Sequence, residues 1–257
     1  MKPSSPSGPL HTVAAIGAAF RLTGQALVRM VTPPMDLKET WRQLDRIGVG
    51  SLNLTNITAL FTGMVLAVQS AYTLSKFGAR LYIGEIVTLS LVRELGPVLT
   101  ALMVGGRVGS GIAAELGSMT VTEQVDALRS MAADPVRKLV VPRLWATLLM
   151  LPALTVLADG MGIIGGLFIA VFQEGLTASF YFTRVFRALE FNDLVLGLTK
   201  PAVFAFIIAI IGCYNGLNAR GGADGVGRAT TNTVYAASIC ILIADFFFTK
   251  LIIGMVP

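Results

Sequence analysis

The sequence predicts an all-α membrane protein with five transmembrane helices. Of its 257 residues, 54% are hydrophobic and 14% are charged, whereas an average soluble domain has about 25% charged residues. Its mean hydropathy is +0.73, and its apolar residues fall into five long stretches. A soluble chain of this length would lack the polar groups to cover its surface. The composition therefore excludes disordered, collagen-like and disulfide-rich secreted proteins, and it argues against an ordinary cytosolic enzyme.

Residues 1–50 are predicted to form cytoplasmic or interfacial N-terminal helices. The apolar run at 13–20 is too short to span a bilayer, and Arg21 and Arg29 follow it, whereas a signal peptide needs positive charge before its apolar core. These features favour an interfacial amphipathic helix at about 10–30, with a loosely ordered tail as the alternative. Thr32-Pro33-Pro34 is expected to end that helix, and a second, charge-rich helical stretch follows at 37–47.

Residues 51–257 are predicted to form the five-span domain. A helix needs about 20 mostly apolar residues to cross the hydrocarbon core of a bilayer. Five stretches meet this need, at about 52–74, 86–119, 144–172, 201–217 and 233–256. The second stretch is the least regular because it contains four charged residues, among them Arg107. The third carries Asp159, and no specific role is assigned to Arg107 or Asp159.

The distribution of Lys and Arg predicts a cytoplasmic N-terminus and an outer C-terminus, because cytoplasmic loops retain positive charge. With the N-terminus inside, the cytoplasmic segments hold Lys2, Arg21, Arg29, Lys38, Arg42, Arg46, Arg129, Arg137, Lys138, Arg143, Arg220 and Arg228. The outer segments hold only Lys76, Arg80, Arg184, Arg187 and Lys250. The opposite orientation would reverse this bias.

The second span carries two stripes of small residues. The first consists of Ala101, Gly105, Gly109, Ala113 and Gly117, and the second of Gly106, Ser110, Ala114 and Ser118. Small residues four positions apart let helix backbones approach closely in lipid. The stripes are therefore interpreted either as packing within one subunit or as a seam between subunits. The same glycines lack the Gly-Lys-Ser/Thr ending of a nucleotide-binding loop.

The hydrophilic segment at about 121–133 is predicted to be a short amphipathic helix on the cytoplasmic side. Thr120 and Glu123 have the spacing of a capping box, and Asp134-Pro135 is expected to end this helix and to begin the next one. The apolar positions Val125, Leu128 and Met131 recur at helical spacing, while Gln124 faces elsewhere. The segment is either a helix lying on the membrane surface or a docking element for a partner.

Four ionisable residues lie near the outer ends of the predicted spans. They are Arg93 and Glu94 in the second span, Lys200 at the fourth and Asp245 in the fifth. Because charges at membrane depth are costly, they mark functional positions by default. They are expected to form pairs of opposite charge that either fix helix packing or contact a polar head group. The single histidine, His11, leaves no basis for a histidine metal site or a Ser-His-Asp triad.

Several motifs of this sequence resemble those of the MlaE (YrbE-type) permease family. The resemblance lies first in Leu91-Val92-Arg93-Glu94-Leu95-Gly96-Pro97-Val98, Gly106-Arg107-Val108-Gly109-Ser110 and Ala114-Glu115-Leu116-Gly117. It continues in Thr122-Glu123-Gln124, Met131, Asp134-Pro135 and Pro142-Arg143, which match the coupling helix of the family, and in Gly63-Met64-Val65-Leu66 with Gln69, Asn215-Gly216 and Gly227-Arg228-Ala229-Thr230-Thr231. The matches extend over roughly residues 50–250.

The resemblance implies the non-catalytic membrane subunit of an ABC transporter that moves phospholipids between the two membranes of Gram-negative bacteria and so maintains outer-membrane lipid asymmetry. It implies a homodimer in the inner membrane, with the coupling helix docked on a separate ATPase that binds ATP and Mg. A STAS-domain protein would bind that ATPase, and a hexameric MCE-domain protein would lie on the periplasmic side. The chain itself would bind no cofactor, metal or nucleic acid.

The resemblance also implies an outward-facing phospholipid cavity between two subunits. By position, Arg93, Glu94, Lys200 and Asp245 match polar residues near that cavity, and the first span would contribute Leu66, Gln69 and Tyr72 to its wall. Two other classes compete with this interpretation. One is a secondary transporter or channel driven by an ion gradient, with Asp159, Asp245 and Glu94 as coupling sites; the other is a membrane-embedded lipid enzyme, against which the single histidine counts.

Overall fold

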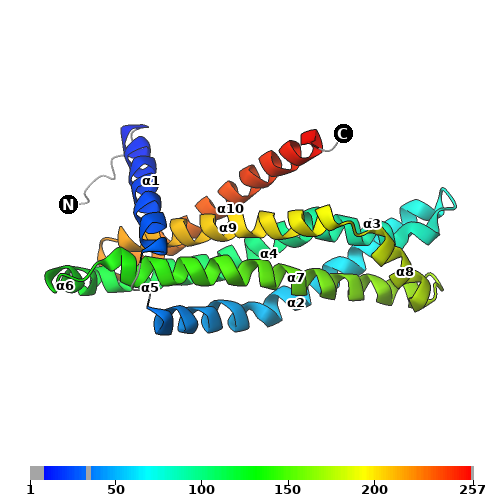
Figure 1. The fold of residues 1–257 in the computed structure, drawn as a ribbon, viewed down its shortest axis with the longest axis horizontal. Helices are drawn as coiled ribbons and strands as arrows, with labels where there is room; N and C mark the ends of the chain where they lie inside the picture. The colour runs from blue at the N-terminus through cyan, green and yellow to red at the C-terminus, as the bar shows by residue number, and fades with distance from the viewer. Residues whose placement is uncertain (1–8, 33–35, 256–257) are drawn as a thin grey trace.

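The computed structural model describes residues 9–32 and 36–255, and the regular elements in this part of the chain are all helices. The long helices run side by side and form an elongated bundle (Figure 1). Five of them are long and apolar enough to cross a membrane: Leu37–Ser75, Arg80–Val121, Val136–Phe172, Phe191–Leu217 and Gly222–Leu251. The predicted all-α fold with five candidate spans is therefore confirmed.

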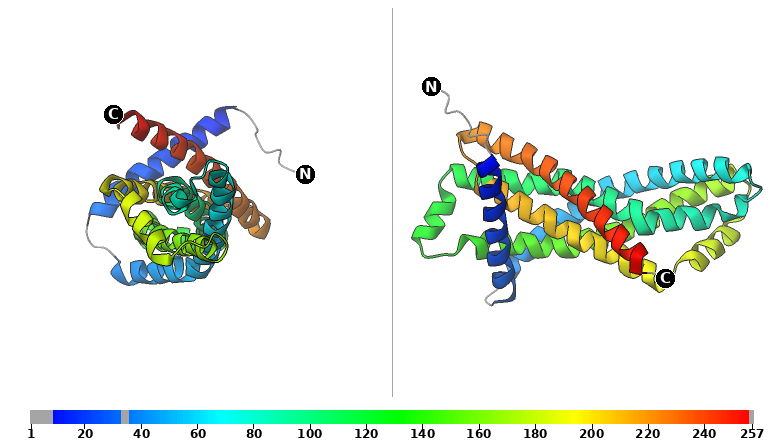
Figure 2. Two further views of the ribbon diagram at one scale, coloured as in Figure 1. Left: turned by 90° about the vertical axis from the view of Figure 1, so that its right-hand side faces the viewer. Right: turned by 90° about the horizontal axis from the view of Figure 1, so that it is seen from above.

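The N-terminal helix α1, Pro9–Val31, crosses the bundle near one end instead of running along it (Figures 1 and 2). Its side chains Ala26 and Met30 are buried against the bundle. Arg29 forms an ion pair with Asp134. The predicted break at Thr32-Pro33-Pro34 lies partly outside the described residues, and the interfacial position of α1 stays a prediction.

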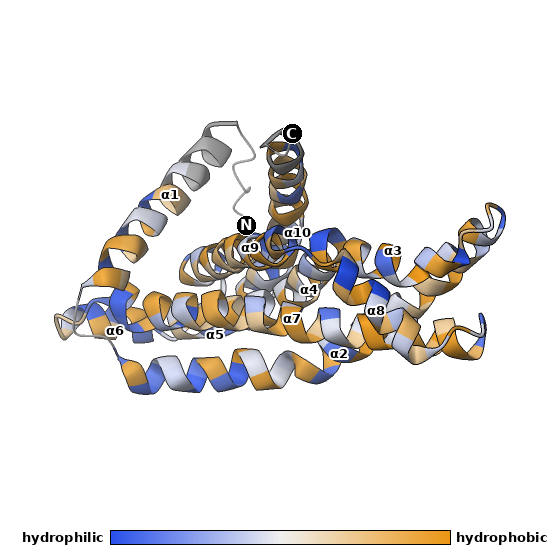
Figure 3. Ribbon diagram, turned by 45° about the vertical axis from the view of Figure 1, so that its right-hand side comes forward, coloured by the Kyte–Doolittle hydropathy of each residue, from blue (hydrophilic) through white to orange (hydrophobic). Residues whose placement is uncertain are grey.

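Helix α2, Leu37–Ser75, is longer than the first predicted span. Asp36 caps its N-terminus, and the carboxylate of Asp36 accepts a hydrogen bond from the Glu39 amide at 3.1 Å. The charge-rich stretch at 37–47 is therefore the beginning of the first membrane helix, and the predicted boundary at residue 50 falls inside it. No proline interrupts the stretch, and its inner face packs on the bundle through Ile47 and Ser51, so the helix continues. Its first turns are visibly more hydrophilic than its continuation (Figure 3).

The second span, expected as one stretch at about 86–119, is a series of short helical segments. They are η1 Arg80–Tyr82, α3 Ile83–Ser90, the π-helix η2 Leu91–Leu95, α4 Gly96–Val104, the π-helix η3 Gly105–Gly109 and α5 Ser110–Val121. π-Helical segments are rare in proteins, and many of those that occur lie at functional sites. The charged residues Arg93, Glu94 and Arg107 all lie in the two π segments.

Helix α6, Gln124–Ser130, lies at the end of the bundle that α1 crosses (Figure 1). The predicted capping box is wrong. Thr120 still belongs to α5 and donates its hydroxyl to the Leu116 carbonyl at 2.7 Å, while Glu123 adopts a left-handed conformation with φ 60°. The helix is also shorter than the predicted 121–133, because the chain turns at Thr122 and Glu123 before α6 begins.

Asp134 caps the segment that follows, as predicted, by accepting a hydrogen bond from the Val136 amide at 3.0 Å. The π-helix η4, Val136–Val140, leads into α7, Val141–Phe172. Helix α7 packs closely along α2, and glycines on both helices allow the two backbones to approach each other. A Cβ atom at Gly63 would collide with the Gly162 carbonyl, and one at Gly165 would collide with the backbone of Leu60.

The region between the third and fourth spans contains a short helix that the sequence did not reveal. Helix α8, Ala178–Ala188, lies at the opposite end of the bundle from α6 (Figure 1). Its Tyr181 is buried and donates a hydrogen bond to the Ile163 carbonyl at 3.2 Å, and Arg184 bonds Glu85 of α3 at 2.9 Å.

The last two helices begin earlier than predicted. Helix α9, Phe191–Leu217, includes Pro201 in its interior, so the fourth span does not begin at that proline. A capping box of Glu190 and Asp193 stabilises the earlier start. Helix α10, Gly222–Met255, also begins before the predicted residue 233 and slants across the bundle (Figure 2).

Candidate functional site

The ammonium group of Lys200 is the centre of a polar cluster inside one end of the bundle. This residue is 1% exposed on α9. Its Nζ donates hydrogen bonds to the Arg93 carbonyl at 2.9 Å, to Glu94 Oε2 at 2.7 Å and to Thr249 Oγ1 at 2.9 Å. It also lies 3.1 Å from Asp245 Oδ1 as an ion pair. One buried cation therefore joins the second, fourth and fifth spans.

The backbone acceptor in this cluster, the Arg93 carbonyl, lies where the α-helical hydrogen-bond pattern is interrupted. An α-helical carbonyl normally accepts from the amide four residues later, but a proline at that position has no N–H to donate. Arg93 lies four residues before Pro97, in the π segment η2. Its carbonyl therefore lacks the usual helical donor, and Lys200 supplies one from a neighbouring helix.

The side chain of Arg93 pairs with Asp193, a partner that was not predicted from the sequence. Its Nε donates to Asp193 Oδ1 at 2.6 Å. Asp193 is almost fully buried, and its other oxygen accepts from the Glu190 amide at 3.2 Å. Asp193 was missed because the fourth span was expected to start at residue 201. The signal that could have found it is the capping-box spacing of Glu190 and Asp193 before an apolar run.

A cavity of about 500 Å³ opens beside this cluster. Its lining is Leu89, Ser90, Arg93, Glu94, Glu190, Asn192, Asp193, Leu196, Lys200 and Thr249. The side chains of Arg93 and Glu94 remain 48% and 42% exposed while they hold their partners. The cavity therefore presents a cation that can bind an anionic group and a carboxylate that can bind a cationic one, with apolar walls beside them.

The structure brings the four predicted ionisable residues into one cluster. The predicted pairing of opposite charges is found for Lys200, which contacts Glu94 and Asp245, whereas Arg93 pairs with Asp193. The three predicted wall residues of the first span lie elsewhere. Gln69 and Tyr72 are exposed on α2, and Leu66 packs in a separate apolar cluster, so none of them lines this cavity within one chain.

The small-residue stripes of the second span differ in what they contact. Gly105 faces Ile208 of α9, Gly109 faces Ile208 and Thr233, and Gly117 faces Ala219 and Val226. Ala113 of the same stripe is fully buried. The first stripe therefore packs within the chain. In the second stripe, a Cβ atom at Gly106 would meet nothing within 4 Å, and Ser110 donates its hydroxyl back to the Gly106 carbonyl at 2.5 Å.

Asp159 lies in the middle of α7 with 8% exposure. Its Oδ1 has no hydrogen-bond partner within the described chain, and it fills the space that a side chain at Gly96 would need. Threonines 55, 58 and 62 of α2 lie around the same small cavity. This carboxyl group is therefore separate from the Lys200 cluster.

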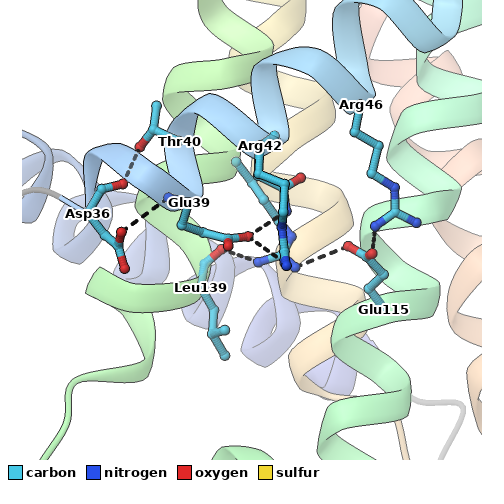
Figure 4. A network of polar contacts seen from close by, with 9 residues as sticks. Asp36, Glu39, Thr40, Arg42, Arg46, Glu115 and Leu139 are labelled. Atoms are coloured by element: carbon cyan, nitrogen blue, oxygen red, sulfur yellow. Dashed lines mark hydrogen bonds and ion pairs between the residues drawn. The ribbon is translucent and has the colours of Figure 1, made fainter.

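The opposite end of the bundle carries a second polar network, which joins α2, α5 and α7 (Figure 4). Arg143 is buried and donates to Glu115 Oε2 at 3.1 Å and to the Leu139 carbonyl at 2.6 Å. Arg46 of α2 forms an ion pair with the other oxygen of Glu115, and Glu39 accepts from Arg42 at 3.0 Å.

Helix α6 projects from this end with most of its surface uncovered. Val125 is buried and Leu128 is half-buried against the core, and they anchor the helix. Glu123, Gln124 and Met131 are exposed, Met131 to 69%. Of the predicted coupling-helix residues, Asp134 and Pro135 lie beyond α6, in the connection to η4.

Comparison with known proteins identifies the family. A family model described as Permease MlaE matches residues 40–251. The chain belongs to the MlaE permease family. A probable ABC transporter permease protein of Rickettsia typhi is 45% identical over 88% of each chain. A protein of the same description from Synechocystis is 43% identical, with 91% of this chain and 89% of the relative covered. The intermembrane phospholipid transport system permease protein MlaE of Haemophilus influenzae is 37% identical, with 83% and 82% covered.

Membership of the MlaE family makes this chain an ABC transporter permease with five candidate membrane helices. The predicted resemblance is confirmed, and the matched range contains the Lys200 cluster, helix α6 and the Glu115 network. Its relatives are described as permeases, which agrees with a membrane subunit that carries no catalytic centre of its own.

Proposed function

We propose that this chain is the membrane subunit of an ATP-driven transporter that moves phospholipids between the inner and outer membranes of a Gram-negative cell and maintains outer-membrane lipid asymmetry. The named role of the Haemophilus relative in intermembrane phospholipid transport supports the substrate. The observation that carries the proposal is the cavity beside Lys200, because it combines apolar walls with one accessible cation and one accessible carboxylate.

Such a cavity suits the head group of a phospholipid. Arg93 can bind the phosphate through charge-assisted hydrogen bonds, and Glu94 can bind an ammonium group when the lipid carries one. Lys200 would act as a positioning residue, because its ammonium group already donates three hydrogen bonds to acceptors of the protein. The acyl chains would lie along apolar helix faces such as Leu89 and Leu196.

ATP and Mg would bind to a separate cytoplasmic ABC ATPase, on which α6 would dock as a coupling helix. The uncovered surface of α6 supports this assignment. Its anchors connect it to the bundle, and Asp134 beyond it holds Arg29 of α1, so closure of the ATPase would reach both the spans and the N-terminal helix. The remaining proposed partners are a second copy of this chain, a STAS-domain protein on the ATPase and a periplasmic hexameric MCE-domain protein.

The proposed topology places α6 and the N-terminus in the cytoplasm and the C-terminus in the periplasm. The Lys200 cavity would then lie near the outer leaflet of the inner membrane. The bias of Lys and Arg toward the α6 side supports this orientation. A phospholipid could enter from that leaflet and remain partly within the cavity while the ATPase cycle changes its access.

The decisive experiment compares Arg93→Gln with Arg187→Gln in the reconstituted transporter with its partners. Both variants lose one positive charge, and Arg187 lies exposed on α8 at the same end of the bundle. We expect Arg93→Gln to lower ATP-dependent phospholipid transfer per assembled transporter about tenfold, the loss of one charge-assisted hydrogen bond, and also to lower the unfolding temperature, because the buried Asp193 loses its cation. Equal transfer by the two variants would show that the cavity is not part of the transport path.

Photocrosslinking tests the predicted lipid wall on the first span. A photoreactive residue at position 66 or 72 should capture phospholipid in the assembled dimer if α2 borders the cavity between subunits. Capture only from positions that face the bulk bilayer would contradict this part of the proposal.

A transporter driven by an ion gradient is the second candidate function, favoured by the unpartnered carboxyl group of Asp159. It requires transport by this chain alone in liposomes with an ion gradient, whereas the ABC proposal requires the ATPase. Asp159→Asn distinguishes the two, because it removes a titratable group and keeps the size of the side chain. Normal ATP-dependent transfer by this variant would exclude ion coupling at Asp159.

A further inference from the structure

A second cavity lies at the α6 end of the bundle, between α2 and the second span. Its volume is about 170 Å³, and its lining is Gln43, Arg46, Ile47, Arg107, Val108, Gly111, Ile112 and Glu115. It is far along the bundle from the Lys200 cavity and shares no lining residue with it. Two arginines from different helices face this one space.

Arg107 has an unusual environment for a charged group in a membrane helix. It lies in the π segment η3, and its Nη1 donates to Ser51 Oγ of α2 at 3.1 Å. No carboxylate of the described chain lies within 4.0 Å of its guanidinium. Its side chain is exposed at this end of the bundle, where a guanidinium group can bind an anion from the surroundings. The geometry therefore leaves room for an anionic partner at this position.

The backbone of α2 is shaped to receive this guanidinium. Gly50 lies beside it, and a Cβ atom there would be 3.0 Å from Arg107 Nη2. The absence of a side chain at Gly50 thus allows Arg107 to lie against the helix, close to Ser51. Arg46 is five residues before Ser51, or about 7.5 Å along the helix, and both arginines line the same cavity.

The charges around the cavity leave an excess of positive charge. The one carboxylate of the lining, Glu115, already holds Arg46 and the buried Arg143. Glu39, the other carboxylate of this network, pairs with Arg42, so the guanidinium group of Arg107 has no carboxylate of its own among the described residues. An anion of the size of a phosphate group would complete the charge balance, and guanidinium groups bind phosphate oxygens in bidentate fashion.

The apolar surface next to the cavity indicates the source of that phosphate. Leu54 and Ile57 of α2 expose large parts of their side chains just beyond Ser51. A free phosphate ion would not use this surface, whereas the acyl chains of a lipid would cover it. The arginines lie where this exposed apolar face begins, which is the depth of phospholipid head groups.

From this arrangement we propose that the cavity binds the phosphate of a phospholipid in the leaflet at the α6 end, held by Arg107 and Arg46. This lipid site is distinct from the cavity beside Lys200. The proposal rests on the proposed function only in the choice of a phospholipid as ligand, and it requires neither ATP hydrolysis nor transfer. An anionic phospholipid such as phosphatidylglycerol matches the excess positive charge best.

Photocrosslinking from position 111 tests the site directly. Gly111 lines the cavity, and a Cβ atom there would meet nothing within 4 Å, so position 111 can carry the side chain of p-benzoylphenylalanine without a clash at its root. The full chain is reconstituted in phosphatidylcholine vesicles that contain a minor fraction of radiolabelled phosphatidylglycerol. A photoreactive residue at Val156, exposed on α7, reports capture from the general bilayer.

We expect Arg107→Gln to reduce capture of phosphatidylglycerol at position 111 about tenfold, as one lost charge-assisted hydrogen bond requires. Arg107→Lys should retain most of this capture, because it keeps the positive charge at this position. Capture at position 156 should be the same in all variants, which shows that each variant is inserted and folded. Arg187→Gln, which removes an exposed positive charge at the other end of the bundle, should not change capture at position 111.

Three outcomes would overturn the proposal. Equal capture at position 111 by the unsubstituted chain and by the Arg107→Gln variant would show that the guanidinium does not hold the lipid. Abolition of capture by excess inorganic phosphate would identify a free-anion site instead of a lipid site. A crosslink from position 111 to a second copy of the chain, in place of lipid, would show that this surface is a subunit contact.

Discussion

Lys200 and Arg93 are joined by a hydrogen bond from an ammonium group to a backbone carbonyl, 2.9 Å long, across two helices. Pro97 removes the amide that would otherwise donate to this carbonyl, and Lys200 takes its place. The proline, the π segment and the buried lysine therefore form one structural unit, which holds Arg93 and Glu94 at the edge of the cavity.

Replacement of Lys200 by Met tests how much this unit contributes to stability. The variant leaves Glu94 and Asp245 without their cation. Loss of one partner costs about 3–5 kcal/mol where the remaining charge is fully buried, and less here because solvent screens the partly exposed carboxylates. We expect a clearly lower thermal unfolding temperature in detergent. Lys250→Met is the matched control, because Lys250 is exposed on α10. Equal unfolding temperatures of the two variants would contradict the assigned role of Lys200.

The close approach of α2 and α7 predicts a large effect of a very small change. A Cβ atom at Gly63 would collide with the Gly162 carbonyl, which is backbone and cannot rotate away. Gly63→Ala should therefore cost about 1–3 kcal/mol, as overpacking typically does. Gly106→Ala adds the same methyl group in open space, and we expect it to change stability by less than about 0.5 kcal/mol. Thermal unfolding of both variants measures the difference.

Glu115 is predicted to be the most important carboxylate of the α6 end. Glu115→Gln removes the charge that Arg46 and the buried Arg143 share, and we expect a loss of about 3 kcal/mol or more in stability. Asp126→Asn also removes one carboxylate, but its partner Arg129 is exposed, and such surface pairs contribute about 0–1 kcal/mol. If both variants unfold at the same temperature, the network of Figure 4 does not stabilise the fold.

The exposed face of α6 predicts the contact with the ATPase. Met131→Glu changes an outward side chain and should prevent co-purification of the ATPase, because a charge would be buried in the contact. Leu128→Glu should also prevent it, but Leu128 packs partly against the core, so that variant tests folding as well. Phe186→Glu, an equally exposed change on α8, is the control. Normal co-purification with the Met131 variant would show that α6 docks elsewhere.

Helix existence and type were predictable because each span carries a long apolar stretch, and lipid imposes helix on such a stretch. Helix boundaries were harder to predict. The fourth helix begins at Phe191 and contains Pro201, because a capping box and packing against the second span outweigh the proline. The capping box expected at Thr120 failed because the preceding helix continues past that residue.

The residues of the candidate site were likewise only partly predictable from the sequence. Lys200, Glu94 and Asp245 could be chosen from the sequence because charge at membrane depth is rare and costly. Asp193 could not be chosen in this way. Its carboxylate reaches Arg93 only because the helix begins at Phe191, before the predicted start at residue 201. The cavity at Arg46 and Arg107 depends on the crossing of two helices, which no local pattern of residues contains.

By itself, the amino-acid sequence determined the membrane environment, the helical fold and the short set of charges that lie within the predicted spans, since all three depend on the cost of polar groups in lipid. The tertiary structure alone decided which of these charges meet. It showed that Lys200 holds two carboxylates and a carbonyl, that Arg93 pairs with Asp193, and that Arg107 faces a cavity. Pairing depends on the distance between helices, and only their packing sets that distance.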